Sequence, residues 1–347
     1  MTTARILGFL IGLAVLAFVF ARFRRARLSR ADFLMGLLFS VSLITVSANP
    51  NSVNTLRDML LLSEGQFSRL IALLIASNVL VWLLLLYTRY RYSLHLEQFD
   101  RTLRHLGTME FRRVYPEIET LAPILVVIPA YNEEENIGVV LDAMPSSVRD
   151  SPVQVLVIDD GSADRTLEVA RKHGALAIRS PINRGGGAAL RLGFDVANEF
   201  GAEIAVTMDA DGQHLPSEIA GLVLPILEGR EDFVIGSRIL GTRERDSAVR
   251  YIGIRVFNAV IRLVSAVRVS DCSNGFRALR ISKLSRLDLR QDQFHTAELI
   301  IDAAKKGVAI GEAPVTVKRR HSGESKKGKN WTYGLNFAKT IFKTWIR

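Results

Sequence analysis

Apolar residues crowd the first ninety positions of the chain and then recur in short runs from Ile124 onward. Three early segments, at 6–22, 33–48 and 70–87, are long, and their interiors carry no Asp, Glu, Lys or Arg. The apolar core of a bilayer is roughly 30 Å thick and needs about 20 helical residues to cross it. The pattern therefore predicts a membrane module at 1–92 with about three transmembrane helices. Uncharged interiors favour an anchor over an ion path.

Arginines between the predicted helices indicate how the module is oriented. The segment from Arg22 to Arg30 holds five arginines, and Arg89 and Arg91 follow the third helix. Cytoplasmic loops of membrane proteins are enriched in Lys and Arg. We therefore expect an integral protein of the cell (inner) membrane, with the chain after Arg91 in the cytoplasm. Arginines where a cleavage site would need small residues disfavour a cleaved signal peptide.

A segment of helical periodicity at 93–121 follows the membrane module. Leu96, Phe99, Leu103 and Leu106 recur at the spacing of one helix face. Such an apolar stripe can lie on a membrane surface or pack on a folded domain. The sequence leaves both open, and we interpret the segment as a linker helix.

From residue 122 to 327 the pattern changes to short apolar runs, each followed by a polar turn and a helical stretch. This alternation predicts an α/β fold, a Rossmann-like and mostly parallel sheet with helices on both faces. Ligands of such sheets bind outside the carboxyl ends of the strands. The residues just after each run are therefore candidates for chemistry. The runs are 124–128, 153–158, 176–180, 203–208 and 232–237.

Composition and charge narrow the classes of function. Hydrophobic residues make up 48% of the chain, and its single cysteine, Cys272, allows no internal disulfide, which indicates a reducing compartment. The formal net charge of +10 is concentrated at the two ends of the chain: residues 318–347 hold nine Lys or Arg against Glu324. These basic residues bracket a neutral-to-acidic middle of the chain instead of forming one groove-sized patch, so we expect no nucleic-acid partner.

Polar loops follow the second and third apolar runs. A carboxylate of Asp159-Asp160-Gly161-Ser162 could accept hydrogen bonds from ribose hydroxyls or base N–H groups, although Asp-Gly is also ordinary turn chemistry. Asn183-Arg184-Gly185-Gly186-Gly187 opens a helix, and glycines there let the backbone approach an anionic ligand. Leu190 stands where a dinucleotide fingerprint needs its third glycine. Candidate nucleotide-binding residues in the second loop are Asn183, Gly185 and Gly187.

The fourth run ends in MDADGQH, with Asp209 and Asp211 one residue apart. Two carboxylates at a strand end lie on the same side if the chain stays extended. Hard oxygen ligands suit Mg²⁺ or Mn²⁺, and such an ion bridging to a diphosphate needs only one or two protein carboxylates. Gln213 and His214 share the loop, and we interpret His214 as a surface loop histidine.

Six segments occur in the order and at the spacing of family 2 glycosyltransferases with the GT-A fold. They are PAYNEEEN (129–136), DDGSADRT (159–166), NRGGGAALRLGF (183–194), MDADGQH (208–214), GSR (236–238) and DCSNGFRALR (271–280). Within this family, the chain most resembles the polyprenyl-phosphate sugar synthases, over roughly residues 123–327. The first part resembles a small three-helix membrane module.

The resemblance implies roles for individual residues. Pro129, Tyr131, Glu133 and Asp160 would hold the nucleotide, and Asp209, Asp211 and Gln213 would hold Mg²⁺ or Mn²⁺ and the donor diphosphate. Ser237, Arg238, Arg250, Arg255, Arg320, Ser325 and Lys326 would lie near the donor and acceptor phosphates. We expect Asp209, Asp211 and Arg238 to be the catalytic residues.

Two positions depart from the family pattern. Gly186 stands where relatives often have a lysine, and Asn274 replaces the serine of the usual SGF. Both bear on the diphosphate and sugar contacts. The string Q-x-x-R-W of polymerising synthases is absent from the sequence, which disfavours a processive enzyme.

The activity that the resemblance implies is a metal-dependent, inverting transfer of a hexose to a polyprenyl phosphate at the cytoplasmic face of the membrane. The donor would be a nucleotide-diphospho-sugar of the GDP-mannose or UDP-glucose type. The alternatives are another lipid acceptor, a protein acceptor, or a catalytically silent sugar-nucleotide sensor. The membrane helices also allow a homo-oligomer.

Aromatic residues alternate with lysines in the tail at 328–347. Such a segment predicts an amphipathic helix at an anionic membrane surface. The alternative is a C-terminal helix packed on the domain with its lysines in solvent.

Overall fold

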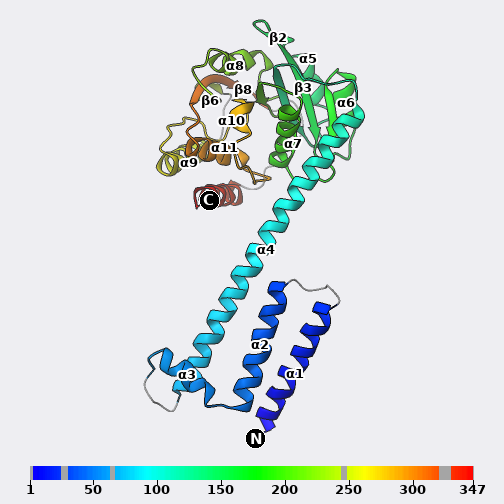
Figure 1. Cartoon of the computed structure of the whole chain (residues 1–347). Coiled ribbons are helices and arrows are strands. Elements are labelled where there is room, and N and C mark those ends of the chain that lie inside the picture. The colour runs from blue at the N-terminus through cyan, green and yellow to red at the C-terminus, as the bar shows by residue number, and fades with distance from the viewer. Residues whose placement is uncertain (1–2, 25–29, 63–66, 244–247, 320–329, 347) are drawn as a thin grey trace. The chain divides into compact units, whose positions relative to one another are not determined.

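The computed structural model describes all residues except 1–2, 25–29, 63–66, 244–247, 320–329 and 347. The chain forms two compact units, Met1–His95 and Leu96–Arg347. Figure 1 shows their elements in chain order.

The first unit is helical. Its elements are α1 (Thr3–Arg24), α2 (Arg30–Ala48), α3 (Ser52–Met59) and the beginning of α4 (Ser68–Val114). Small residues let α1 and α2 pack closely, because a Cβ on Gly8, Gly12 or Gly36 would come within 2.6–2.7 Å of a side chain on the other helix. The aliphatic residues around these contacts stay exposed on the outer faces of the helices.

Candidate membrane spans coincide with the predicted apolar segments. In the described part of the chain, α1 and α4 are long and apolar enough to cross a membrane. Helices α2 and α3 meet at 111° and pass the same test only as a bent pair. The predicted helices at 6–22, 33–48 and 70–87 fall within α1, α2 and α4.

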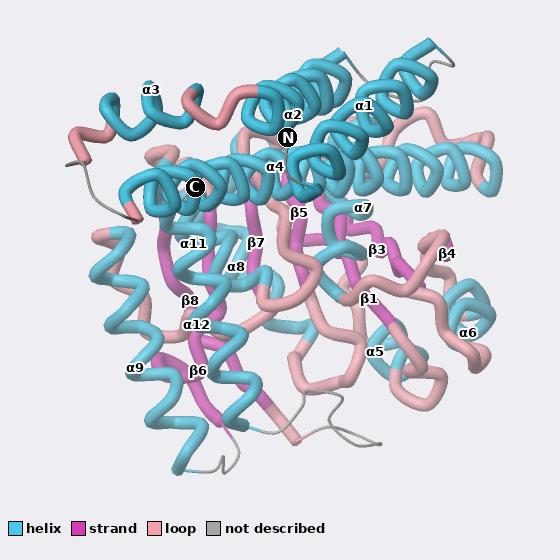
Figure 2. The backbone as a smooth tube through the Cα atoms, turned by 90° about the horizontal axis from the view of Figure 1, so that it is seen from below, coloured by secondary structure: helices cyan, strands magenta, loops and turns pink. Residues whose placement is uncertain are grey.

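The second unit is built on a mixed eight-stranded sheet. The strand order is β2-β3-β1-β5-β7-β6-β8, and β4 pairs with the other part of β3. Strand β7 runs antiparallel to β5 and β6, β2 runs antiparallel to β3, and the other neighbouring strands are parallel. Figure 2 shows the strands side by side. Their bounds are β1 Ile124–Ala130, β2 Ser147–Val148, β3 Ser151–Asp159, β4 Leu176–Arg179, β5 Ile204–Thr207, β6 Phe233–Arg243, β7 Arg277–Arg280 and β8 Ile310–Val317.

Helices cover both faces of this sheet. Because successive strand residues point to opposite faces, Leu125 and Val127 of β1 enter one buried core and Ile124, Val126 and Ile128 enter the other. The first core includes residues of α7 (Gly186–Glu199), α10 (Ile281–Leu284), α11 (His295–Lys305), α9 (Ala248–Ser265) and α12 (Asn330–Ile346). The second includes residues of α5 (Ile137–Asp142), α6 (Thr166–Lys172) and α8 (Ile219–Leu227), which the 3-10 turn Pro216–Glu218 precedes. The predicted α/β architecture is confirmed.

The segment predicted as a linker helix at 93–121 is helical as far as Val114, where it forms the second half of α4 and packs on α7. Phe111 is fully buried with its ring centroid 4.8 Å from that of Phe200, and a Cβ on Gly107 would come 2.6 Å from Leu192. The predicted apolar stripe is not the packing face, because Leu96 and Leu106 of that stripe are about half exposed. Phe111, Gly107 and the arginines Arg104 and Arg112 of α4 make the contact instead.

The C-terminal helix α12 also packs on the second unit. Phe337 is fully buried, and its ring lies 4.6 Å from that of Phe257 on α9. Lys305 of α11 donates hydrogen bonds to the carbonyls of Thr344 and Trp345 at 2.8 and 2.7 Å. One face of the tail is therefore docked, while Phe342 and Trp345 remain about half exposed.

We predict that the contact between α7 and β1 requires a glycine at position 193. A Cβ there would lie 2.2 Å from Cγ1 of Val127, whereas nothing lies within 4 Å of a Cβ on Gly221 in α8. Overpacking of this kind costs about 1–3 kcal/mol, so Gly193→Ala should lower the melting temperature of the solubilised chain. Gly221→Ala should leave it unchanged or raise it, because alanine favours a helix by roughly 0.5–1 kcal/mol. Equal melting temperatures for the two variants would contradict the packing.

Candidate active site

The loop after β3 uses its two acids differently. Asp159 is fully buried and accepts hydrogen bonds from the Ser162 amide at 2.9 Å and from Nε of Arg179 at 2.7 Å, so it closes the turn. Asp160 accepts the backbone amides of Arg184 at 3.1 Å and Gly185 at 2.6 Å. The turn interpretation therefore holds for Asp159, whereas Asp160 bonds to the glycine loop, and nucleotide binding by Asp160 stays a prediction.

The Asp160 carboxylate is held in a desolvated position. Its residue is 3% exposed. Burial raises the pKa of Asp160 above its ordinary value, and the hydrogen bonds from Arg184 and Gly185 partly oppose this. The two amides stabilise the ionised form of Asp160. Their hydrogen bonds fix the position of the glycine loop relative to the end of β3.

The loop after β1 is tied to the loop after β3. Its Asn132 amide donates to Oγ of Ser162 at 2.9 Å, and its Glu133 amide donates to Oγ1 of Thr166 at 2.8 Å. Glu133 is buried and accepts a hydrogen bond from Nδ2 of Asn136 at 2.6 Å. Among the other nucleotide candidates here, Pro129 is half-buried and Tyr131 is exposed.

The glycines at 185 and 187 are required by contact with another loop. Gly185 has φ +104°, and a Cβ on it would come 2.9 Å from the Asp292 carbonyl oxygen. A Cβ on Gly187 would come 2.3 Å from the Gln291 carbonyl oxygen. The Gly187 amide donates to the Asp292 carbonyl at 2.8 Å.

The backbone amides of the glycine loop are used differently from the anion site that the sequence predicted. We expected the amides of the glycine loop to face a ligand, but those of Arg184, Gly185 and Gly187 donate to protein oxygens. Asn183 is exposed beside them. A Cβ on Gly186 would meet only Pro129 side-chain atoms, at 3.9 Å, so this position has room for a side chain.

Sequence reasoning gave no role to the loop at 288–293 or to Glu298. The Glu298 carboxylate is fully buried and accepts the backbone amides of Arg290 at 3.0 Å and Gln291 at 2.9 Å. It therefore fixes the loop that contacts the glycines. The signal in the sequence was an acid in the first turn of a helix, the position where carboxylates accept backbone amides.

The loop after β5 carries the candidate metal ligands. Asp211 is 5% exposed and accepts the Gln213 amide at 3.1 Å. Asp209 is half-buried, and a Cβ on Gly275 would lie 3.0 Å from its Oδ1. Gln213 is joined to β8, because its side chain donates to the Lys318 carbonyl at 3.0 Å and its carbonyl accepts the Lys318 amide at 2.8 Å.

The donor set fits a hard divalent cation. Asp209 and Asp211 would supply carboxylate oxygens, and because Nε2 of Gln213 donates to the Lys318 carbonyl, Oε1 would be the amide atom available to a cation. Within the described ranges no three His, Cys, Asp or Glu side chains group as a metal site. Two carboxylates suffice for an ion that also binds substrate phosphates.

His214 is buried, so its interpretation as a surface loop histidine is wrong. It is 5% exposed, and its ring stacks on Phe276 at 5.1 Å. Its Nε2 lies 2.8 Å from Oδ1 of Asn274, an atom that also accepts the Phe276 amide. Because an amide oxygen can only accept, Nε2 carries the proton. Periodicity does not reveal such burial, since the stacking ring comes from a distant loop.

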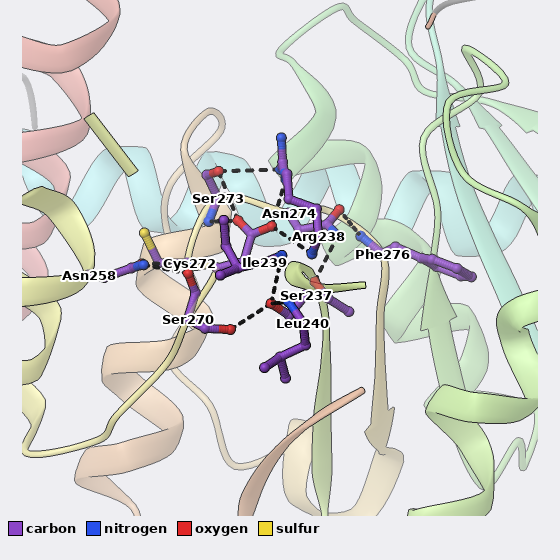
Figure 3. Close-up of polar contacts among 12 residues, drawn as sticks. Ser237, Arg238, Ile239, Leu240, Asn258, Ser270, Cys272, Ser273, Asn274 and Phe276 are labelled. Atoms are coloured by element: carbon purple, nitrogen blue, oxygen red, sulfur yellow. Dashed lines mark hydrogen bonds and ion pairs between the residues drawn. The ribbon is translucent and has the colours of Figure 1, made fainter. Parts of the chain in front are cut away.

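Asn274 connects three segments of the site. Besides His214, its Nδ2 donates to the Gly236 carbonyl at 2.7 Å. It therefore joins the loop after β5, strand β6 and its own loop. Figure 3 shows Asn274 with Phe276, whose amide its Oδ1 accepts. The departure from the family serine thus has a structural role.

The GSR motif lies in the same network. Arg238 is 6% exposed and pairs with the fully buried Asp271 at 2.6 Å. Ser237 is fully buried, with its hydroxyl 2.5 Å from that of Ser270 (Figure 3). The guanidinium of Arg238 at the candidate site is therefore paired with the Asp271 carboxylate.

Two further buried residues are Cys272, in the 271–277 loop that leads into β7, and Arg277, the first residue of β7. Arg277 is fully buried and donates to the carbonyls of Asn274, Thr296 and Cys272 at 2.7–2.8 Å. Its burial lowers its pKa to about 10. Burial and the nearby Asp271 raise the pKa of the Cys272 thiol to about 12.

The remaining acceptor candidates are less closely joined to the site. Arg255 is exposed on α9, one turn before Asn258, whose side chain accepts the Cys272 amide at 3.0 Å. Arg250 lies in the first turn of α9, where the structure gives only the backbone. Arg320, Ser325 and Lys326 lie outside the described residues.

This fold, with its polar loops at one sheet edge, is that of the GT-A nucleotide-sugar transferases. Residues 125–288 match the model of glycosyl transferase family 2. The chain belongs to that family and is a glycosyltransferase, as the sequence motifs predicted.

Two relatives each share about a third of the aligned residues with this chain. A UDP-N-acetylglucosamine–dolichyl-phosphate N-acetylglucosaminyltransferase of Methanococcus voltae is 33% identical, over 55% of this chain and 84% of the relative. A polyprenol monophosphomannose synthase of Mycolicibacterium smegmatis is 32% identical, over 63% of this chain and 84% of the relative.

A solved structure supports the fold. Glucosyl-3-phosphoglycerate synthase from Mycobacterium tuberculosis, in complex with Mn²⁺, UDP-glucose and phosphoglyceric acid, superposes with a TM-score of 0.54. It is 23% identical and covers 69% of this chain and 83% of the other.

We predict that Asn274→Ala weakens the candidate site. The change leaves the Gly236 carbonyl and the buried His214 Nε2–H without this partner, and an unsatisfied buried group costs about 1–3 kcal/mol. Thermal unfolding should show a lower melting temperature, and Mn²⁺ affinity should fall. Ser273→Ala is the matched control, because that hydroxyl makes only contacts of 3.2 and 3.4 Å. Equal Mn²⁺ affinity in both variants would argue against this role of Asn274.

Proposed function

We propose that this chain is a membrane-anchored, metal-dependent, inverting glycosyltransferase with a polyprenyl phosphate as acceptor. The donor is a nucleotide-diphospho-hexose of the GDP-mannose or UDP-glucose type. The reaction takes place at the cytoplasmic face of the cell membrane.

The observation that carries this proposal is the group of polar loops at one edge of the sheet. Asp160 holds the glycine loop, and the loop of Asp209 and Asp211 is joined to the 271–277 loop through His214 and Asn274. The nucleotide-binding candidate Asp160 follows β3 and the metal-binding candidates follow β5, and these parallel strands lie on either side of β1. Ligands of such sheets bind outside the carboxyl ends of the strands. The acceptor class follows the names of the two relatives, which act on dolichyl phosphate and make a polyprenol monophosphate sugar.

The chemistry needs few protein groups. A phosphate monoester has a second pKa of about 6, so the acceptor oxygen is largely ionised at neutral pH and needs no general base. Attack by this oxygen on the anomeric carbon breaks the bond to the diphosphate and inverts the configuration. Asp209, Asp211 and Gln213 would hold the metal ion, which supplies charge neutralisation at the departing diphosphate.

Binding the acceptor requires cations near the membrane. The cations that we propose for phosphate binding are Arg238, Arg250, Arg255, Arg320 and Lys326, and Asp271 orients Arg238 through their ion pair. The candidate spans α1 and α4 would keep the domain close to a lipid-linked acceptor. Exposed Phe342 and Trp345 with the tail lysines would add an interfacial contact.

We predict that Asp211→Ala abolishes sugar transfer to lipid. Membranes containing the full chain would receive labelled GDP- and UDP-sugars with polyprenyl phosphate, with Mn²⁺, Mg²⁺ or EDTA. The wild type should label extractable lipid from one donor in a metal-dependent way, and Asp211→Ala should lose about a hundredfold or more, as when one transition-state electrostatic contact is removed. Asp142→Asn is the matched control, because Asp142 is an exposed acid paired with His173 at 2.6 Å.

Other outcomes would select an alternative. If the labelled sugar appears in protein or in a different lipid class, the chain is a glycosyltransferase with another acceptor than polyprenyl phosphate. Nucleotide-sugar binding without transfer from any donor would overturn the synthase and favour a sensor. Transfer that persists in EDTA and in Asp211→Ala would overturn the metal site.

A further inference from the structure

A buried cluster of charges joins α4 to the glycine loop within the second unit. Asp100 of α4 lies 2.7 Å from Arg184, 2.9 Å from Arg191 and 2.9 Å from Arg104. Arg184 also pairs with Asp292 at 2.8 Å, and Arg191 pairs with the same acid. The cluster thus joins three segments, which are α4, the start of α7 and the loop before α11.

The charges in this cluster depend on one another. The Arg191 side chain is 4% exposed and the Asp100 side chain 16%. Burial alone would raise the pKa of Asp100, but Arg191 and Arg104 outweigh it and hold that pKa below its ordinary value. Asp100 is therefore ionised at neutral pH. Removing one member of a buried ion pair leaves an uncompensated charge, which is strongly unfavourable.

Arg184 transmits this contact to the backbone of the glycine loop. Its amide donates to Asp160 at 3.1 Å, while its guanidinium is held by Asp100 and Asp292. The next residue, Gly185, donates to Asp160 and lies against the Asp292 carbonyl. The loop is therefore fixed from two sides, by the β3 end and by α4.

We propose that Asp100 is a positioning residue for the nucleotide-sugar donor and acts through Arg184 and Arg191 on the loop at 183–187. This rests on the proposed function and on the prediction that Asn183, Gly185 and Gly187 belong to its nucleotide site. The helix that contains a candidate membrane span then also supplies part of the framework of the donor site. The catalytic unit consequently begins before residue 122, where the sequence pattern placed its start.

The test compares Asp100→Asn with Glu199→Gln in the full chain. Glu199, the last residue of α7, pairs with Arg112 near the end of α4. Its substitution therefore removes a contact between α4 and α7 but none with the glycine loop. UDP and GDP binding with Mn²⁺ would be measured by calorimetry, and donor KM and kcat in the transfer assay. Asp100→Asn should weaken nucleotide binding and raise donor KM by about threefold to thirtyfold, the usual range for residues that act through others. Its kcat at saturating donor should change little, and Glu199→Gln should behave as wild type.

Further variants separate the possible failures. Asp160→Ala removes the acceptor of two loop amides directly. Unchanged nucleotide binding in Asp160→Ala would refute the donor site itself. Weakened binding in Asp160→Ala with unchanged KM in Asp100→Asn would overturn the positioning role alone. If Asp100→Asn does not fold, Asp100→Glu keeps the charge with one more methylene; a raised KM with normal kcat supports the proposal, and an unchanged KM overturns it.

Discussion

The contact between the Asp160 carboxylate and the glycine-loop amides determines how the candidate donor site is arranged. The carboxylate is buried at the end of β3, so its charge is acceptable only while backbone donors surround it. Those donors belong to Arg184 and Gly185, whose position depends in turn on the 288–293 loop and on Glu298. A single buried charge thus links residues that are far apart in the sequence.

The apolar strands of the sheet and the long apolar helices near the N-terminus were predictable from the sequence. Strands β1, β3, β4, β5 and β6 coincide with the five apolar runs, because burial on both faces requires such runs. Strand β7 escaped prediction, since two of its four residues are Arg277 and Arg280. A buried arginine in a strand is stable only because distant carbonyls accept its donors, and no local pattern records that.

For the candidate site, the motifs identified which loops matter but not what each side chain does. Burial of His214 depends on Asn274 and Phe276, sixty and more positions away. The sequence left open whether the apolar stripe of α4 packs on the domain. In the structure Leu96 and Leu106 of that stripe are about half exposed, and Phe111 with small and charged side chains makes the contact with α7. The role of Asp100 could not be predicted from the sequence either, because its partners Arg184 and Arg191 lie more than eighty residues further along the chain.

The burial of Cys272 makes the chain convenient for site-specific labelling. It is the single cysteine of the sequence, it has no exposed surface, and its thiol stays protonated at neutral pH. Since the thiolate is the reactive form, alkylating probes should leave the native thiol untouched. One cysteine introduced at an exposed position could then carry a fluorophore or spin label with no background substitution. Labelling of Cys272 itself would report the opening of the 271–277 loop.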